Sequence, residues 1–209
     1  MSDAVDFTKR GAIGVITVNS PPVNALSAAV RDGLGEAFDK GHADPEVKAM
    51  VLLGGGRTFI AGADIREFGQ PPRGKPLHEV LDSMENSDKI IVAAIHGTAL
   101  GGGLEVTLCC HYRFAVPNSM VGLPEVKLGL IPGAGGTQRL PRLVGAIKAL
   151  DLITSGNFVP APQAMELGIV DEIGENLLEG SVAFAEKLVA EHAQQICAAL
   201  GNFLINRRR

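Results

Sequence analysis

The sequence of 209 residues lacks a disulfide framework, an excess of basic residues and a long apolar run. Its cysteines, Cys109, Cys110 and Cys197, are odd in number and two are adjacent, which favours reduced thiols in a reducing compartment. The formal net charge of -4 provides no basic field for nucleic acid. We interpret the only run of arginines, Arg207 to Arg209, as a solvated tail.

No apolar stretch approaches the length of a membrane span, and the first residues lack the basic segment that opens a secretory signal. We therefore expect a soluble, cytoplasmic protein with neither a membrane nor nucleic acid among its partners. The five histidines show no ligand spacing, so the sequence predicts no metal site.

What the sequence does contain is typical of one globular domain with many tight turns. Apolar residues make up 46% of the chain, charged residues 20%, and there are 26 glycines. Strand and helix patterns alternate, which predicts α/β layering. Strands are expected at 11–18, 48–53, 89–95, 112–116 and 169–173. Helices are expected at 27–40, 77–86, 137–143, 146–155, 160–168 and 177–199, besides one in the stretch described next.

The most informative stretch runs from Ile91 to Cys110. The pattern predicts a buried strand, a turn at Gly97, three consecutive glycines and an apolar helix whose first turn carries Glu105. N–H groups at a helix start have no intrahelical partner, and glycines leave them open, so they favour an oxygen that gains negative charge. From this stretch alone, Glu105 fits equally well a functional carboxylate and an acid that complements the helix dipole.

A second carboxylate, Glu125, follows Pro124 and precedes a glycine-rich run. With these residues the chain resembles the crotonase superfamily, the enoyl-CoA hydratases and isomerases. The resemblance rests on three motifs in the family's order: FIAGADI at 59–65, HGTALGGGLE at 96–105 and LPEVKLGLIPGAGGTQRL at 123–140. The residues at 110–113 are similar to the hydratase part of multifunctional fatty-acid oxidation enzymes.

The resemblance implies an α/β fold built as a crotonase-like spiral of β-β-α repeats, assembled into trimers or dimers of trimers. We assign residues 1–192 to an enoyl-CoA hydratase/isomerase domain. Residues 193–209 match nothing we recognise in the family and are treated as a divergent C-terminal tail. The family's C-terminal helices, which cover the acyl pocket, are expected to be missing.

For the chemistry, the resemblance implies that the N–H groups of Ala63 and Gly102 bind a thioester oxygen as it gains negative charge. Preorganised amides of this kind are commonly the largest single contribution to such a reaction. Glu125 is expected to protonate the α-carbon while Glu105 holds and activates the water, the two titrating as a coupled pair. The predicted activity is hydration of trans-2-enoyl-CoA to 3-hydroxyacyl-CoA in fatty-acid β-oxidation.

No separate cofactor is expected, because coenzyme A is part of the substrate. The resemblance places it along Ala25, Ala61, Ala63, Asp64, Ile65 and Gly102. Asp64 is also expected to cap a turn or short helix. His96 is expected to hydrogen-bond the turn after its strand. Either an acyl tunnel or the core contains Leu26, Phe68, Leu81 and Met84.

Two other functions stay open. An isomerase that moves a double bond from the 3- to the 2-position needs only the acid at Glu125. The presence of Glu105 therefore favours a hydratase, and isomerase activity at the same site stays an alternative. A scaffold that binds acyl-CoA without turnover has no need of two acids in an apolar cleft, which argues against it. The loop at 132–137 resembles a phosphate cradle, but no Gly-Lys-Ser/Thr follows, so a P-loop is excluded.

Overall fold

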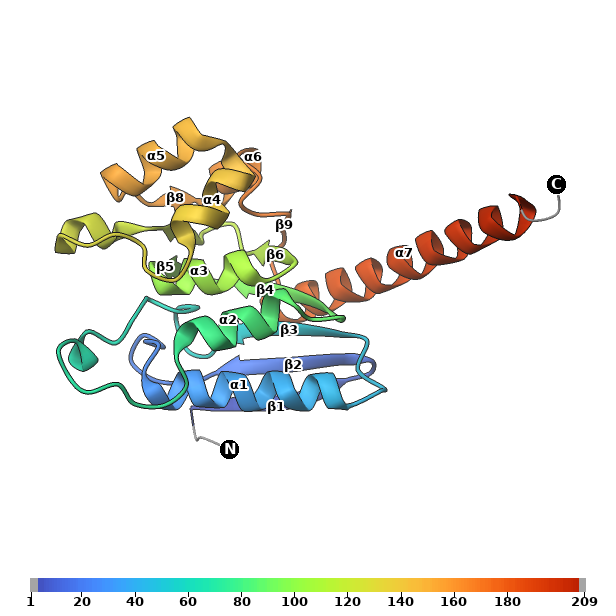
Figure 1. Cartoon of the computed structure of the whole chain (residues 1–209), viewed down its shortest axis with the longest axis horizontal. Helices are drawn as coiled ribbons and strands as arrows, with labels where there is room; N and C mark the ends of the chain where they lie inside the picture. The colour runs from blue at the N-terminus through green and yellow to red at the C-terminus, as the bar shows by residue number, and fades with distance from the viewer. Residues whose placement is uncertain (1–3, 207–209) are drawn as a thin grey trace.

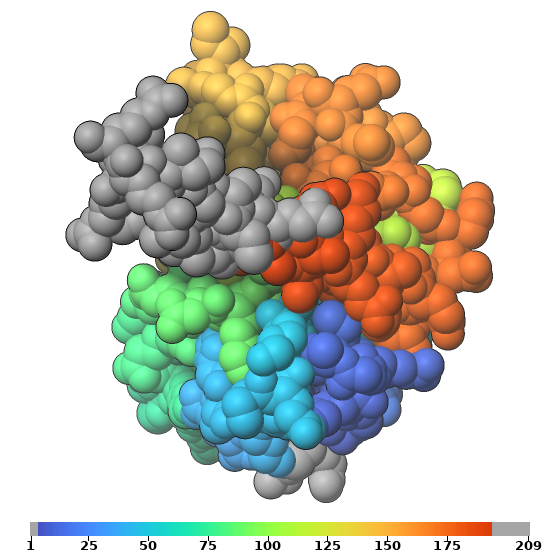
Figure 2. Space-filling model, turned by 90° about the vertical axis from the view of Figure 1, so that its right-hand side faces the viewer, coloured from blue at the N-terminus to red at the C-terminus, as the bar shows by residue number. Residues whose placement is uncertain are grey.

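The computed structural model describes the backbone of residues 4–206 and the side chains of residues 4–193. The arginine run at 207–209 and the side chain of Cys197 therefore lie outside the described part. Figure 1 shows a layered body of sheet and helices from which the last helix, α7 (Leu177–Asn206), projects. Figure 2 views the molecule from that side, with the N-terminal region in blue and cyan below and the C-terminal region in orange above.

The main sheet has six strands in the order β1-β2-β3-β4-β6-β9. They are β1 (Val5–Arg10), β2 (Ile13–Val18), β3 (Ala49–Gly54), β4 (Ile90–Ile95), β6 (Tyr112–Ala115) and β9 (Glu172–Ile173). β1 pairs antiparallel with β2, and the later pairs are parallel. β3 is buried along its whole length and β4 along all but its first residue, as expected for parallel strands covered on both faces.

A second sheet of three short strands has the order β5-β7-β8. They are β5 (Thr98–Leu100), β7 (Met120–Gly122) and β8 (Val159–Pro160). The sequence does not predict these strands, because segments this short carry no periodic pattern and form only where a partner strand pairs with them. It also does not predict β1, whose outer residues are mostly polar and exposed.

Two predicted strands are shorter than expected. The strand expected at 11–18 begins at Ile13, and the one expected at 169–173 keeps only Glu172–Ile173. Ile169 and Val170 are buried, yet their N–H groups donate to the carbonyl oxygen of Ala164 and not to a neighbouring strand. A short apolar run does not distinguish a strand from a buried loop, so this part of the prediction is wrong.

The predicted helices are confirmed to within a few residues, except that the last one continues past its expected end at 199 to Asn206. They are α1 (Ala28–Ala43), α2 (Leu77–Glu85), α3 (Gly102–Cys109), α4 (Gly136–Val144), α5 (Ala146–Ser155) and α6 (Ala161–Glu166), besides α7. Two short 3₁₀ helices, η1 (Ile65–Glu67) and η2 (Pro124–Leu128), precede α2 and α4. Ser27 caps α1, since its hydroxyl accepts a hydrogen bond from the N–H of Val30. Gly168, at φ 75, follows the end of α6 in the conformation that glycine favours there.

The core is divided between the two faces of the main sheet. The larger hydrophobic cluster includes Phe38 of α1, Met84 of α2 and Val106 of α3. The smaller cluster contains Phe184 and Leu188 of α7, packed on residues of β2, β3, β4 and β6. The first part of α7 therefore covers one face of the sheet, and the helix carrying Glu105 belongs to the other face.

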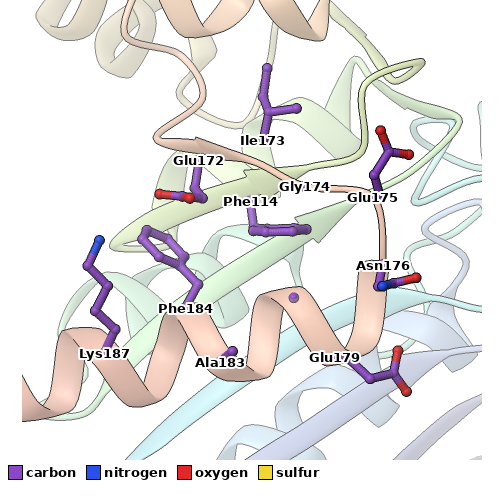
Figure 3. A pocket seen from close by; sticks show the side chains of 11 residues that line it. Phe114, Glu172, Ile173, Gly174, Glu175, Asn176, Glu179, Ala183, Phe184 and Lys187 are labelled. Atoms are coloured by element: carbon purple, nitrogen blue, oxygen red, sulfur yellow. The ribbon is translucent and has the colours of Figure 1, made fainter.

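Where α7 begins, a cavity of about 390 Å³ opens beside β6 and β9 (Figure 3). The rings of Phe114 and Phe184 form part of its wall, with centroids 6.3 Å apart. A Cβ atom on Gly174 or Gly180 would stand 2.7 or 2.6 Å from Cζ of Phe114, so a side chain at either position would displace that ring. This cavity does not contain Glu105 or Glu125, which line a different cleft of the molecule.

Cys109 and Cys110 are buried free thiols at the end of α3, as the sequence predicts. Burial raises the pKa of the Cys109 thiol to about 12 and also raises the pKa of Cys110. Both thiols are therefore unreactive parts of the core. Among the described residues, no helix has both the length and the apolar surface needed to cross a bilayer.

Candidate active site

A cleft of about 450 Å³ brings together segments that are far apart in the sequence. Its walls come from the loop around η1, the start of α2, the start of α3, η2 and the loop before α4. The residues that line it are Ala61, Gly62, Ala63, Ile65, Phe68, Leu77, His78, Gly101, Gly102, Glu105, Pro124, Glu125, Leu128, Leu130, Ile131, Gly133 and Ala134. Both predicted amide donors and both predicted acids are therefore in one cleft.

The main chain at Ala63 and at Gly102 meets at the back of this cleft. Leu26 and Ala63 form an isolated parallel bridge in which the N–H of Leu26 donates to the carbonyl oxygen of Gly62. The ideal Cβ position of Gly102 lies 3.7 Å from the nitrogen of Ala63. Gly102 is the first residue of α3, where an N–H has no intrahelical partner. The peptide nitrogen of Ala63 thus lies close to the α-carbon of the residue that begins α3.

Glycines make this approach possible. Gly101 has φ 52 and turns the chain from β5 into α3, while its N–H donates to the carbonyl oxygen of Gly122 in the second sheet. At Gly103 a Cβ atom would overlap the carbonyl oxygen of Ile60 and lie 2.9 Å from its carbonyl carbon. The start of α3 therefore packs directly on the backbone that leads to Ala63, which no other residue type permits.

Glu105 lies inside the cleft and is only 2% exposed. Its Oε1 accepts hydrogen bonds from the N–H groups of Ala134, at 2.7 Å, and Gly136, at 2.8 Å. Burial raises the pKa of this carboxyl group, and the two hydrogen bonds and the charge of Arg139 oppose that rise. A buried acid on an otherwise apolar helix is not a residue that merely complements the helix dipole at the surface.

Glu125 faces the same cleft from η2. Its Oε1 lies 3.1 Å from the ideal Cβ position of Gly101, and its buried Oε2 has no hydrogen-bond partner among the described residues. Burial raises the pKa of Glu125, and the neighbouring charge of Glu105 raises it further. The charge of Glu105 therefore disfavours ionisation of Glu125, and titration of the two acids as a coupled pair stays a prediction.

The residues predicted to bind coenzyme A divide into two groups. Ala61, Ala63, Ile65 and Gly102 line the cleft, whereas Ala25 and Asp64 are not among its lining residues. Asp64 caps η1 as predicted, accepting from the N–H of Arg66 and forming an ion pair with the Arg66 guanidinium at 2.7 Å. That ion pair lowers the pKa of Asp64.

The predicted tunnel residues also separate. Phe68 lines the cleft, but Leu81 and Met84 are buried core residues outside it. Leu26 packs beneath Gly102, with its Cδ1 2.9 Å from the ideal Cβ position. Sequence reasoning did not identify the apolar wall residues Leu77, Leu128, Leu130 and Ile131, or the wall residue His78. The apolar residues that recur between Glu125 and the glycine-rich loop are the sequence signal that could have identified this wall.

His96 lies outside the cleft lining, and its side chain contacts a different turn from the one expected after its own strand. Its Nε2 lies 3.1 Å from the carbonyl oxygen of Gly56, in the turn after β3. A second turn contact comes from Asn24, which has φ 54 and whose side-chain amide donates to the carbonyl oxygens of Gly55, Thr58 and Phe59. Asn24 therefore fixes the segment that leads into the Ala61–Ala63 wall.

The fold and the cleft together define a protein of the crotonase class: a mainly parallel sheet, a glycine-rich helix start, and a buried and a half-buried acid around one cavity. The family model for enoyl-CoA hydratase/isomerase matches residues 8–205, so the chain belongs to that family. This match extends past residue 192, into the segment that we treat as a divergent tail.

Individual relatives agree with the family assignment. The chain is 50% identical over 187 residues to a peroxisomal bifunctional enzyme of Danio rerio, which covers 89% of this chain and 26% of the relative. It thus spans about a quarter of the length of the bifunctional relatives. It is 41% identical to a probable enoyl-CoA hydratase of Bacillus subtilis, covering 99% of this chain and 83% of the relative. The structure of an enoyl-CoA hydratase from Bacillus anthracis matches with a TM-score of 0.83 at 32% identity, covering 90% of this chain and 77% of that one.

Proposed function

We propose that this protein is an enoyl-CoA hydratase, which adds water across the double bond of trans-2-enoyl-CoA to give 3-hydroxyacyl-CoA in fatty-acid β-oxidation. The observation that carries the proposal is that one cleft is lined by two adjoining main-chain segments, at Ala63 and Gly102, and by two acids with raised pKa. Relatives with hydratase and bifunctional β-oxidation names support the same reaction.

The two amides would act on the thioester carbonyl. As water attacks the β-carbon, electrons move through the double bond onto the thioester oxygen and give it enolate character. The N–H groups of Ala63 and Gly102 stabilise that charge, and the dipole of α3 adds to them because Gly102 begins the helix. Loss of one such donor typically costs about 10²–10³ in rate.

The two acids would divide the proton transfers. Glu105, ionised, takes a proton from the water while the water oxygen bonds to the β-carbon. Glu125, protonated, gives its proton to the α-carbon. The raised pKa of Glu125 favours the protonated state at the start of the cycle. Afterwards one proton must return from Glu105 to Glu125, and the electrostatic coupling of the pair makes a shared proton favourable.

The cleft wall supports an acyl-CoA thioester as substrate. Coenzyme A would run along Ala25 and the 61–65 segment, with its thioester end at Gly102. Apolar side chains form the opposite wall, among them Leu128, which is 66% exposed, and Ile131, which is 75% exposed. An alkyl chain would cover this surface, which water otherwise contacts.

Isomerisation of a 3-enoyl to a 2-enoyl thioester is the second candidate. It is favoured by the buried, unpartnered Oε2 of Glu125, since one such carboxyl beside the two amides suffices to move a proton between the α- and γ-carbons.

A trimer or dimer of trimers stays a proposal, supported by exposed apolar residues on α5 such as Ile147. A cytoplasmic location also stays a proposal, and several relatives are named as peroxisomal.

The test is a spectrophotometric assay with crotonyl-CoA, which loses its conjugated absorbance on hydration, followed by longer 2-enoyl and 3-enoyl thioesters. Wild type should hydrate the substrate, and Glu105→Gln or Glu125→Gln should reduce kcat by about 10²–10⁴. Glu166→Gln, an exposed position on α6, is the matched control. Undiminished hydration by Glu125→Gln would refute the mechanism. Tight acyl-CoA binding without turnover by wild type would identify a scaffold instead.

A further inference from the structure

The orientation of Glu105 depends on the loop that precedes α4. This loop, residues 132–136, has the sequence Pro-Gly-Ala-Gly-Gly and therefore has no polar side chain of its own. It nevertheless supplies both hydrogen bonds that Oε1 of Glu105 accepts, from Ala134 and Gly136. A side chain on Gly136 would crowd that oxygen, since its ideal Cβ position lies 3.0 Å from Oε1. Contacts from outside the loop must therefore hold it in place.

Arg139 provides such a contact from the first turns of α4. Its Nη1 donates to the carbonyl oxygen of Ala134 at 2.9 Å. Its Nε and Nη2 donate to the two carboxylate oxygens of Glu85, at 3.1 and 2.7 Å, at the end of α2. The Arg139 side chain is only 17% exposed. It lies against the loop at Gly135, which has φ 96, and a Cβ atom on Gly135 would collide with Nη1 of Arg139. One guanidinium thus joins α2 to the loop that holds Glu105.

We propose that Arg139 and Glu85 form a positioning pair for Glu105. Arg139 holds the Ala134 carbonyl group, so that the N–H groups of Ala134 and Gly136 stay aimed at Oε1 and the second carboxylate oxygen stays directed at the water. Glu85 fixes Arg139 through a two-pronged ion pair, the geometry that gives arginine its directional strength. This inference rests on the proposed hydratase function for its catalytic consequence and on geometry alone for the contact.

The charge of Arg139 acts on Glu105 directly, whereas its hydrogen bonds reach Glu105 only through the loop at Ala134. Burial raises the pKa of Glu105, and the positive charge of Arg139 lowers it. The ionisable groups around Glu105 are Glu125 on η2, His78, Asp82 and Glu85 on α2, Arg139 on α4 and Cys109 on its own helix. Of these, Arg139 is the cation that favours the ionised form of Glu105, so its removal should make Glu105 harder to ionise.

The experiment compares Arg139→Gln with Arg142→Gln. Arg142 lies on the same helix but is exposed, and its Nη1 donates to the carbonyl oxygen of Gln138 within that helix. In the crotonyl-CoA assay we expect Arg139→Gln to lower kcat roughly 10–100-fold, the usual effect of losing a partner that orients a functional group, with little change in KM. The acidic limb of its pH profile should move to higher pH. Arg142→Gln should match wild type in all three.

A second readout does not depend on turnover. In NMR spectra of ¹³C-labelled protein, the Glu105 carboxyl signal can be assigned because it is lost in Glu105→Gln. This signal should titrate at a higher pH in Arg139→Gln than in wild type, and at the wild-type pH in Arg142→Gln. An unchanged Glu105 titration in Arg139→Gln would overturn the positioning pair, whether or not wild type hydrates crotonyl-CoA. A shifted titration in a protein that hydrates nothing would refute the proposed function and leave the pair standing.

Two further variants address folding and the role of Glu85. If Arg139→Gln does not fold, Arg139→Lys keeps the cation but loses the two-pronged contact, and an intermediate kcat is expected; wild-type kcat would count against the proposal. Glu85→Gln should lower kcat less than Arg139→Gln does. Combined with Arg139→Gln it should add no further loss, because both changes disrupt one unit. Fully additive losses would show that Glu85 acts separately.

Discussion

Gly103 offers the most direct test of how the cleft is built. In the structure the α-carbon of Gly103 lies against the backbone at Ile60, and a Cβ atom there would overlap the Ile60 carbonyl oxygen and stand 2.9 Å from its carbonyl carbon. Neither partner is a flexible side-chain end. Gly103→Ala must therefore push α3 away from the segment that leads to Ala63, by about 1 Å, the scale of misplacement that matters for catalysis.

The expected magnitude follows from that displacement. Overpacking in a rigid site typically costs about 1–3 kcal/mol of unfolding free energy. Moving Gly102 relative to Ala63 by about 1 Å should lower kcat about 10²-fold, because the two amides no longer converge on one oxygen. Urea unfolding gives the first quantity and the crotonyl-CoA assay the second.

Gly133→Ala is the matched control for stability, because a Cβ at Gly133 meets nothing within 4 Å. It should unfold at nearly the wild-type urea concentration. Wild-type stability together with wild-type kcat in Gly103→Ala would refute the close contact between α3 and the Ile60 backbone, and with it our account of why glycine precedes Glu105.

Two other predictions concern stability. Because the folded pKa of Glu125 is raised above its ordinary value of 4.5, the ionised form destabilises the fold. Glu125→Gln should therefore unfold at a higher urea concentration than wild type at pH 7, and this advantage should vanish below about pH 4.5; equal or lower stability at pH 7 would contradict the pKa direction. Asn24→Ala removes the side-chain amide that holds the carbonyl groups of Gly55, Thr58 and Phe59. This substitution should lower the free energy of unfolding by about 1–3 kcal/mol, measured by urea unfolding. It should also weaken acyl-CoA binding, measured by calorimetry. An unchanged affinity would show that this turn does not support the wall along which coenzyme A lies.

Much of the main sheet and most helices could be predicted from local patterns. The run at 48–53 is apolar after Lys48 and is followed by glycines, which is enough to predict a buried strand, and Ser27 marks the start of α1 by its capping chemistry. β5, β7 and β8 could not be predicted in this way. Segments of two or three residues carry no period, and they become strands only because the fold brings partners beside them.

The candidate site shows the same division. The resemblance of three motifs identifies Ala63, Gly102, Glu105 and Glu125, and the structure places all four around one cavity. It does not identify Arg139, because nothing in the local sequence reveals that its guanidinium reaches both the Ala134 carbonyl group and a carboxylate on α2. Nor does it separate Phe68, which lines the cleft, from Met84, which lies in the core.

The order of residues is enough to identify the chemical groups: where glycine replaces side chains at a helix start, which helix carries an acid among apolar residues, and which family these motifs belong to. These properties are local, since backbone freedom and side-chain chemistry are fixed residue by residue. Tertiary structure alone decided which groups meet. The burial that raises the pKa of Glu105 and Glu125, and the contact from Arg139 that orients Glu105, arise between segments that only the folded chain brings together.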